Sequence, residues 1–165
     1  MENMNELIAA IEAMDPEILA SAFLTVAGIF AAMVAYSVIR YLLTAIGYSK
    51  MYRKIGEAPW KAFIPVYNTY NNYKISWNGK LFFLYAALTV GSTLLGIQTE
   101  GFLALVANLV SLGIIFLAVK QNIKMAKLFG KGAGTGIALV FFPGITSLIL
   151  GLGKAEFQAE MIENN

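Results

Sequence analysis

The residue types that carry out most protein chemistry are missing from this chain. Its 165 residues include no Cys and no His. Without them there is no thiolate nucleophile, no imidazole base and no usual zinc or haem ligand. Any catalysis would have to use Ser, Thr, Tyr, Lys or carboxylate groups.

Ser49 and Lys50 are the pair that most resembles a nucleophile and its base. A Ser/Lys peptidase needs the two side chains in contact, but adjacent residues on a helix do not face each other. The pair also lies in a basic stretch, which indicates the cytoplasmic side of a membrane, whereas secreted precursors are cut outside. We interpret them as a surface serine and a lysine that reaches the headgroups, and we predict that the chain is not an enzyme and has no catalytic residue.

The glycines between 130 and 136 suggest a phosphate-binding loop. Such a loop needs Gly-x-x-x-x-Gly-Lys-[Ser/Thr]. Here Lys131 is followed by Gly132, and Met125 stands where the first glycine should be. We interpret these glycines as a helix cap followed by close helix packing, and we predict no cofactor and no metal.

An aromatic and amide-rich segment lies between the only two tryptophans of the chain. The candidate interaction or ligand face consists of Trp60, Lys61, Pro65, Tyr67, Asn68, Tyr70, Asn71, Tyr73 and Trp77. Amide and phenol groups orient small molecules in pockets, and aromatic rings with polar edges favour the headgroup level of a membrane. Both interpretations stay open: a ligand pocket, or an aromatic belt whose Asn side chains satisfy the backbone around Pro65.

Four lysines form a candidate site for anionic lipid. Lys120, Lys124, Lys127 and Lys131 follow each other at steps of four, three and four, which places them along one helical face. Each Lys near an anionic membrane surface contributes about 1 kcal/mol. The stripe therefore indicates membrane topology, and we expect contact with anionic headgroups as well.

Polar and helix-breaking residues interrupt two of the apolar runs. Asn108 and Ser111 favour interhelical hydrogen bonds. Pro143 and Gly144 predict a kink, which serves helix packing or, in a transporter, a gate or substrate site. Because no acid lies within any apolar run, and coupled transport usually employs a buried carboxylate, transport is the alternative rather than the leading hypothesis.

Three segments resemble the marks of one group of proteins. They read Trp-Lys-Ala-Phe-Ile-Pro-Val-Tyr-Asn at 60–68, Ala-Lys-Leu-Phe-Gly-Lys-Gly at 126–132 and Leu-Gly-Leu-Gly at 150–153. From about residue 51 to 157, the chain resembles a family of short bacterial multi-span membrane proteins of unknown function, sometimes labelled signal peptidase I. The resemblance implies a shared architecture and no known activity. Signal peptidases carry a large external catalytic domain, for which this chain has no room.

The composition indicates that the helices carrying these candidate residues lie in a membrane. The chain is 58% hydrophobic and 13% charged, and a soluble domain this small could not hide so much apolar surface. Four apolar runs predict spans at about 18–39, 81–97, 102–119 and 134–152, each near the length of about 20 residues that a bilayer requires.

Charge sets the expected orientation. Eleven of the twelve Lys and Arg residues fall within 40–80 and 120–132, and basic loops stay on the cytoplasmic side. We therefore expect a single domain in the bacterial cytoplasmic membrane, with both termini outside. Nucleic acid is not expected as a partner, because its recognition needs a basic face on a folded soluble body.

The predicted fold is an all-α four-span bundle with a long first helix and an interfacial cytoplasmic helix around Pro65. Asp15-Pro16-Glu17 predicts the start of the first helix, because Asp suits the N-cap and Pro the first helical position. A short amphipathic helix is expected over 1–14, and a cytoplasmic extension of the third helix is expected through Phe129.

The leading functional hypothesis is a non-enzymatic multi-pass membrane protein that acts by helix packing and by protein or lipid contacts. Its partners would be anionic lipids, a second copy of the chain or another membrane protein. The alternative is a small-solute permease or channel subunit with a path past Asn108 and the Pro143-Gly144 break. A membrane hydrolase is the least favoured.

Overall fold

The computed structural model describes residues 4, 15–95 and 101–160, and every element within them is a helix. In order they are α2 (Pro16–Ile55), η1 (Pro59–Phe63), α3 (Pro65–Ser76), α4 (Gly79–Leu95), α5 (Gly101–Leu128), α6 (Ala133–Phe141) and α7 (Pro143–Leu152). The predicted all-α class is confirmed, whereas the helix expected over 1–14 lies outside the described residues. Backbone contacts divide the chain into two units, residues 1–40 and 41–165, so each unit is described by itself.

The long first helix begins where the sequence predicts. The backbone N–H of Glu17 donates to Oδ1 of Asp15 at 2.8 Å, which makes Asp15 the N-cap of α2. From Pro16 the helix continues for 40 residues. Helices α2 and α5 are long and apolar enough to cross a membrane, with mean hydropathies of 2.3 and 2.6 over their most apolar windows.

The core of the second unit lies at the ends of the long helices and not along their apolar runs. Its largest fully buried side chains include Met51 and Tyr52 of α2, Met125 and Leu128 of α5, and Leu139 of α6. Apart from Leu139, these residues belong to the charged, amphipathic ends of α2 and α5, which bury one helical face each. In contrast, only 6% of the apolar window of α5 is buried.

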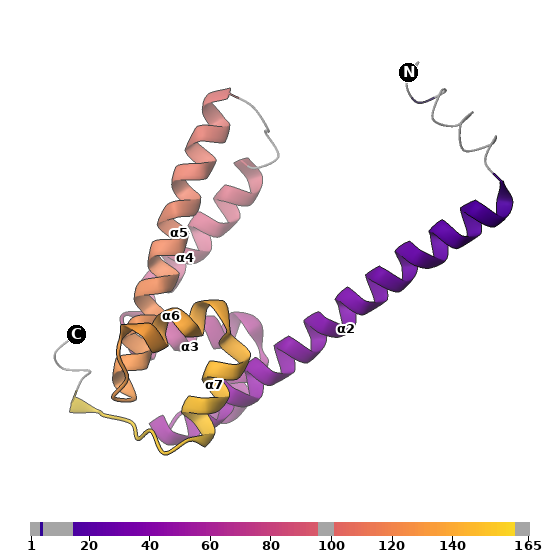
Figure 1. Cartoon of the computed structure of the whole chain (residues 1–165). Coiled ribbons are helices and arrows are strands. Elements are labelled where there is room, and N and C mark those ends of the chain that lie inside the picture. The colour runs from indigo at the N-terminus through magenta and orange to yellow at the C-terminus, as the bar shows by residue number, and fades with distance from the viewer. Residues whose placement is uncertain (1–3, 5–14, 96–100, 161–165) are drawn as a thin grey trace. The chain divides into compact units, whose positions relative to one another are not determined.

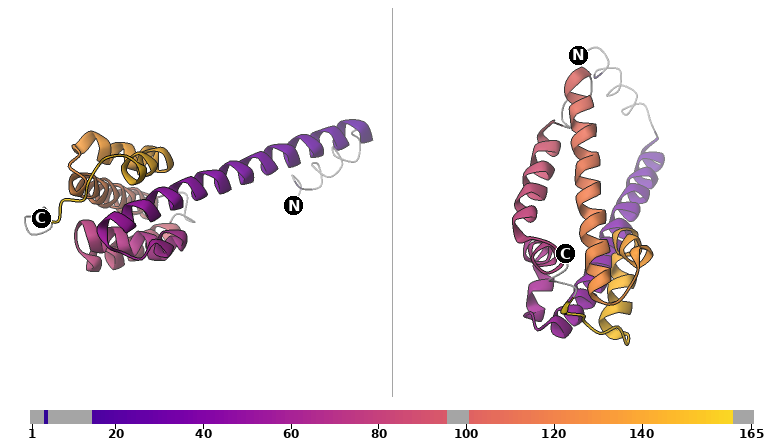
Figure 2. Two further views of the ribbon diagram at one scale, coloured as in Figure 1. Left: turned by 90° about the horizontal axis from the view of Figure 1, so that it is seen from below. Right: turned by 90° about the vertical axis from the view of Figure 1, so that its left-hand side faces the viewer.

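Helices α4 and α5 lie side by side, and α3 packs against both of them (Figure 1; Figure 2). The chain is helical on both sides of Ile64, as expected, because η1 ends at Phe63 and α3 begins at Pro65. Helix α5 extends past its apolar run to Leu128, which confirms the expected extension to within one residue. Gly130 then ends it with a positive φ of 65°.

The fourth span expected over 134–152 is not confirmed. The segment forms two short helices, α6 of 9 residues and α7 of 10, separated at Phe142. Nine residues rise by about 14 Å, which is half of a hydrocarbon core of about 30 Å. The Pro143-Gly144 break therefore does more than kink a span, because it ends one helix and begins another.

The 134–152 segment begins beside the end of α5, and the tail that follows the segment comes back to the same place. The segment begins just after Gly130. Beyond α7, the N–H of Gln158 donates to the carbonyl of Leu128 at 2.8 Å, and the rings of Phe129 and Phe157 lie 6.2 Å apart. We refer to α6 and α7, which are separated by the break at Phe142, as the hairpin; the tail after α7 brings the chain back to the end of α5.

Candidate functional site

The fold brings the aromatic segment and the basic stripe together. Trp77 caps the end of α3, and Nζ of Lys124 on α5 lies 5.0 Å from the centre of its ring. One turn earlier, Nζ of Lys120 lies 5.6 Å from the ring of Phe116. Cation–π contacts of this kind hold a lysine over an aromatic face while its charge remains. We refer to Trp77, Lys120, Lys124 and Lys127 as the basic edge.

Positive charges crowd one another at the basic edge. Partial burial lowers the pKa of Lys124, and the charges of Lys120 and Lys127 lower it further. Lys120 and Lys127 are exposed, as is Lys131 beyond the helix end. An anion placed here would relieve this repulsion, because an opposite charge favours the ammonium form.

The amide-rich part of α3 is buried and holds three helices together. The hydroxyl of Tyr52 on α2 lies 2.8 Å from Oδ1 of Asn72 and 3.0 Å from the carbonyl oxygen of Asn68. The hydroxyl of Ser76 donates to the carbonyl of Asn72 at 2.6 Å and accepts from Nε2 of Gln121 on α5 at 3.2 Å. Burial raises the pKa of the Tyr52 phenol, so Tyr52 stays a neutral donor. These five residues form the Tyr52 network.

Two members of the predicted face are buried beside this network. Asn71 is 1% exposed and Tyr73 is 2% exposed, and the Tyr73 ring lies 5.5 Å from that of Tyr85 on α4. Within the described residues, Nδ2 of Asn71 and the hydroxyl of Tyr73 have no hydrogen-bond partner. The segment is therefore not one outward face, because its amides and Tyr73 pack inward.

The rest of the segment faces outward as a row of aromatic rings. Trp60 and Tyr67 are 55% and 44% exposed. Their rings lie 5.6 Å apart, and Tyr70 continues the row to Phe82 of α4 with a separation of 5.5 Å. Pro65 is exposed beside them. Aromatic rings with polar edges suit the headgroup region of a membrane.

Lys61 forms an ion pair with Glu57, so its ammonium group is not directed toward a ligand or a partner. Its Nζ lies 2.6 Å from Oε2 of Glu57, and Nζ of Lys74 lies 2.9 Å from Oε1 of the same carboxylate. Hydrogen bonds from both lysines lower the pKa of Glu57 to about 2. Glu57 therefore neutralises much of the positive charge near η1 and leaves the basic edge as the more cationic surface.

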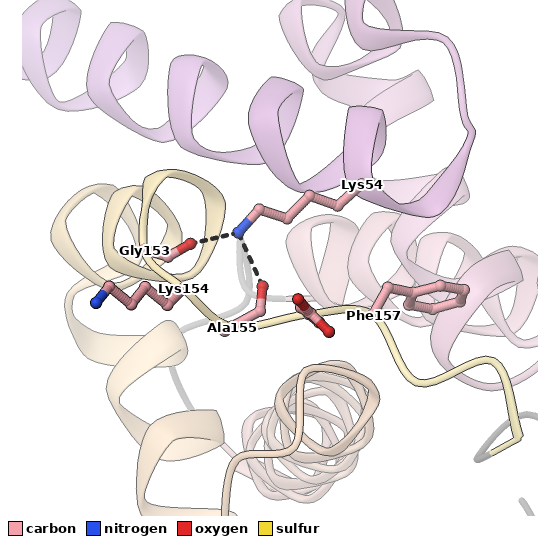
Figure 3. A pocket seen from close by; sticks show the side chains of 6 residues that line it. Lys54, Gly153, Lys154, Ala155 and Phe157 are labelled. Atoms are coloured by element: carbon pink, nitrogen blue, oxygen red, sulfur yellow. Dashed lines mark hydrogen bonds between the residues drawn. The ribbon is translucent and has the colours of Figure 1, made fainter.

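A hollow of about 460 Å³ lies where α2 ends beside the segment after α7 (Figure 3). Nζ of Lys54 reaches into it and donates to the carbonyls of Leu150, Gly153 and Ala155 at 2.8, 2.7 and 2.8 Å. All three ammonium protons are used, so Lys54 caps the negative end of α7 and is not available to a ligand. No sequence pattern predicts this contact, because the partners are backbone atoms about a hundred residues away.

Within the described residues, no hydrogen bond joins the intramembrane candidates on α5 to those at the start of α7. Asn108 is exposed on α5, and the Ser111 hydroxyl donates to the carbonyl of Ala107 in its own helix at 2.8 Å. Pro143 begins α7, and Gly144 behind it is buried. Across the break, Oγ1 of Thr146 donates to the carbonyl of Ala138 at 3.1 Å. The same carbonyl accepts from the N–H of Phe142 at 2.8 Å, so the Thr146 bond ties α7 to the end of α6.

Sequence reasoning missed Tyr52, Gln121 and Lys54. Gln121 could have been found, because Leu117, Gln121, Met125 and Leu128 follow each other at steps of four, four and three and are all buried. A glutamine on that stripe predicts a buried hydrogen bond.

A family model described as "Family of unknown function (DUF5684)" matches residues 60–160. The matched range holds both the aromatic segment and the basic edge. No curated protein and no solved structure matches the chain.

Proposed function

We propose, for a chain that belongs to the DUF5684 family of unknown function, a non-enzymatic role in a membrane in which the basic edge binds anionic lipid headgroups. One observation carries the proposal: Lys124 lies over Trp77 between two further lysines that raise the local positive charge. A phosphate or carboxylate headgroup at this edge would meet several ammonium groups at once. The neighbouring row of aromatic rings would lie at the same level of the bilayer.

The exposed apolar surface supports a membrane location. Within the described residues, the most apolar 18-residue windows of α2 and α5 are 0% and 6% buried. Apolar surface in water costs about 25 cal/mol for each Å². A protein whose apolar helices are exposed to this extent would not remain dispersed in water. Surrounding hydrocarbon removes that cost.

The hairpin of α6 and α7 supports three crossings rather than four. In this arrangement α2, α4 and α5 cross the bilayer, and the hairpin enters and leaves on the side of the basic segments. Backbone at the Phe142 break is compatible with membrane depth because its polar groups are satisfied: the N–H of Phe142 donates to the carbonyl of Ala138 at 2.8 Å, and the carbonyl of Phe142 accepts from the N–H of Thr146 at 3.0 Å. The tail after α7 then lies on the cytoplasmic side with Lys54 and Leu128, opposite to the side expected from four spans.

A cysteine placed at Asn165 is expected to be reachable only from the cytoplasm. The chain has no cysteine of its own, so one introduced thiol gives a clean signal with a membrane-impermeant maleimide. Intact cells should leave N165C unlabelled, and inverted vesicles should label it. A58C and Q98C serve as matched markers for the two sides. Labelling of N165C in intact cells, together with Q98C, would restore the four-span arrangement.

Removing the charges of the basic edge is expected to weaken lipid binding. The triple variant K120Q/K124Q/K127Q should lose anionic lipid from the purified protein by about fivefold for each lysine, because each contributes about 1 kcal/mol. Native mass spectrometry of the protein from mixed anionic and zwitterionic bilayers measures the retained lipid. The control R53Q/K80Q/K154Q removes the same charge from three exposed positions elsewhere. Equal loss of lipid in both variants would mean that lipid retention depends on the total positive charge of the protein and not on the basic edge.

A further inference from the structure

One face of α5 is not covered by the other helices of its own unit, and it carries a regular seam. Leu105, Leu112 and Ile115 are 56%, 63% and 57% exposed, and Asn108, between the first two, is exposed as well. The four positions follow each other at steps of three, four and three. This spacing keeps side chains in register when two helices pair side by side.

Asn108 is the one polar member of this seam, and no hydrogen bond reaches its side chain from the part of the chain that the structure describes. It lies seven residues after Gly101 and twelve before Lys120, or about 10 and 18 Å along the helix. In the membrane placement proposed above, on which this inference rests, its amide therefore lies near mid-depth. An amide without a partner in hydrocarbon costs several kcal/mol.

We propose that α5 pairs with α5 of a second copy of this chain, and that the two Asn108 amides hydrogen-bond across the interface. Copies of one chain insert with the same orientation, so two α5 helices run parallel and place residue 108 at the same depth. An amide both donates and accepts, which makes it complementary to its own copy. A different partner helix would need a polar group at that same depth, whereas lipid tails offer none.

The pairing is tested by cysteine crosslinking in native membranes, on the otherwise cysteine-free chain. L105C and L112C should each give a disulfide-linked dimer under mild oxidation, because both lie on the seam. The matched control is L103C, which is 44% exposed but points to the opposite side of α5. A dimer from L103C equal to that from L112C would show random collision and overturn the proposal.

The role of the amide is tested in the L112C background. N108L should lower the dimer fraction about 3- to 10-fold, because interhelical hydrogen bonds in membranes are modest, and N108Q should largely retain it. An unchanged dimer fraction in N108L, or no dimer from either seam cysteine, overturns the proposal and leaves the face to lipid or to another segment of the same chain. Alkaline extraction of the same membranes separates this outcome from failure of the proposed membrane location, because a chain outside the membrane would be released.

Discussion

Lys54→Met is expected to detach the segment after α7 from the end of α2. The substitution shortens the unbranched side chain by one atom and removes the donor to three carbonyls. Hydrogen bonds from charged donors contribute about 1.5–3 kcal/mol each, and access of water to the hollow reduces their sum. We expect a loss of about 2–4 kcal/mol in the free energy of unfolding, because the last carbonyls of α7 are left without a partner.

Two measurements check this result in mild detergent. The melting temperature should fall by about 5–12 °C, since 1 kcal/mol shifts it by about 2–4 °C in a chain of this size. Trypsin should also cut faster at Lys154, which lies in the released segment. Arg53→Met is the matched control, because it removes an exposed cation one residue away. Equal cutting at Lys154 in both variants would mean that Lys54 does not hold the segment in place.

Gly136→Ala is expected to push α6 away from α5. A Cβ at this position would lie 2.7 Å from the backbone nitrogen of Ile123 and closer still to its Cα. Backbone atoms of a helix cannot move aside as a flexible side chain does, so the two helices must separate. Overpacking of this kind costs about 1–3 kcal/mol and occasionally more, which exceeds the gain of about 0.5–1 kcal/mol from replacing a helical glycine by alanine.

Gly134→Ala provides a control of opposite sign in the same helix. A Cβ there would meet nothing within 4 Å, so only the gain in helix propensity remains and the melting temperature should rise slightly. We expect thermal unfolding to separate the two variants by several degrees. A similar change in both would show that α6 does not approach α5 as closely as the structure has it.

Local sequence features predicted the ends of the elements well. Asp15 and Pro16 marked the start of α2 because an N-cap and a fixed φ act within one turn. Gly130 marked the end of α5 because only glycine readily adopts the left-handed conformation that closes a helix. The small residue at 136 indicated close packing in general, but the sequence could not name Ile123 as the neighbour.

The candidate site was predicted as one aromatic and basic surface built from two stretches of the chain, and only part of it lies as expected. Lys120 and Lys127 are exposed along α5 as the spacing of the stripe indicates, whereas Lys131 is exposed beyond the end of the helix. Lys124 is half-buried over the ring of Trp77. The aromatic segment is divided, since Trp60 and Tyr67 face outward while Asn71 and Tyr73 are buried. Its tyrosines repeat every three residues and therefore drift around a helix of 3.6 residues per turn. Which part of that arc is covered depends on where α2, α4 and α5 lie.

By itself, the sequence determined the helical class, the long apolar helices and the position of the basic residues next to them, because hydrophobicity, helix caps and charge act over one or two turns. The tertiary structure decided that Lys54 caps α7 and that Tyr52 and Gln121 form hydrogen bonds to side chains of α3. It also decided that the segment 134–152 forms two helices separated at Phe142. Those outcomes depend on atoms far apart in the chain. An apolar run of 19 residues is compatible both with one crossing helix and with two short ones folded back at Phe142, and the packing of Gly136 and Gly151 against other helices favours the hairpin.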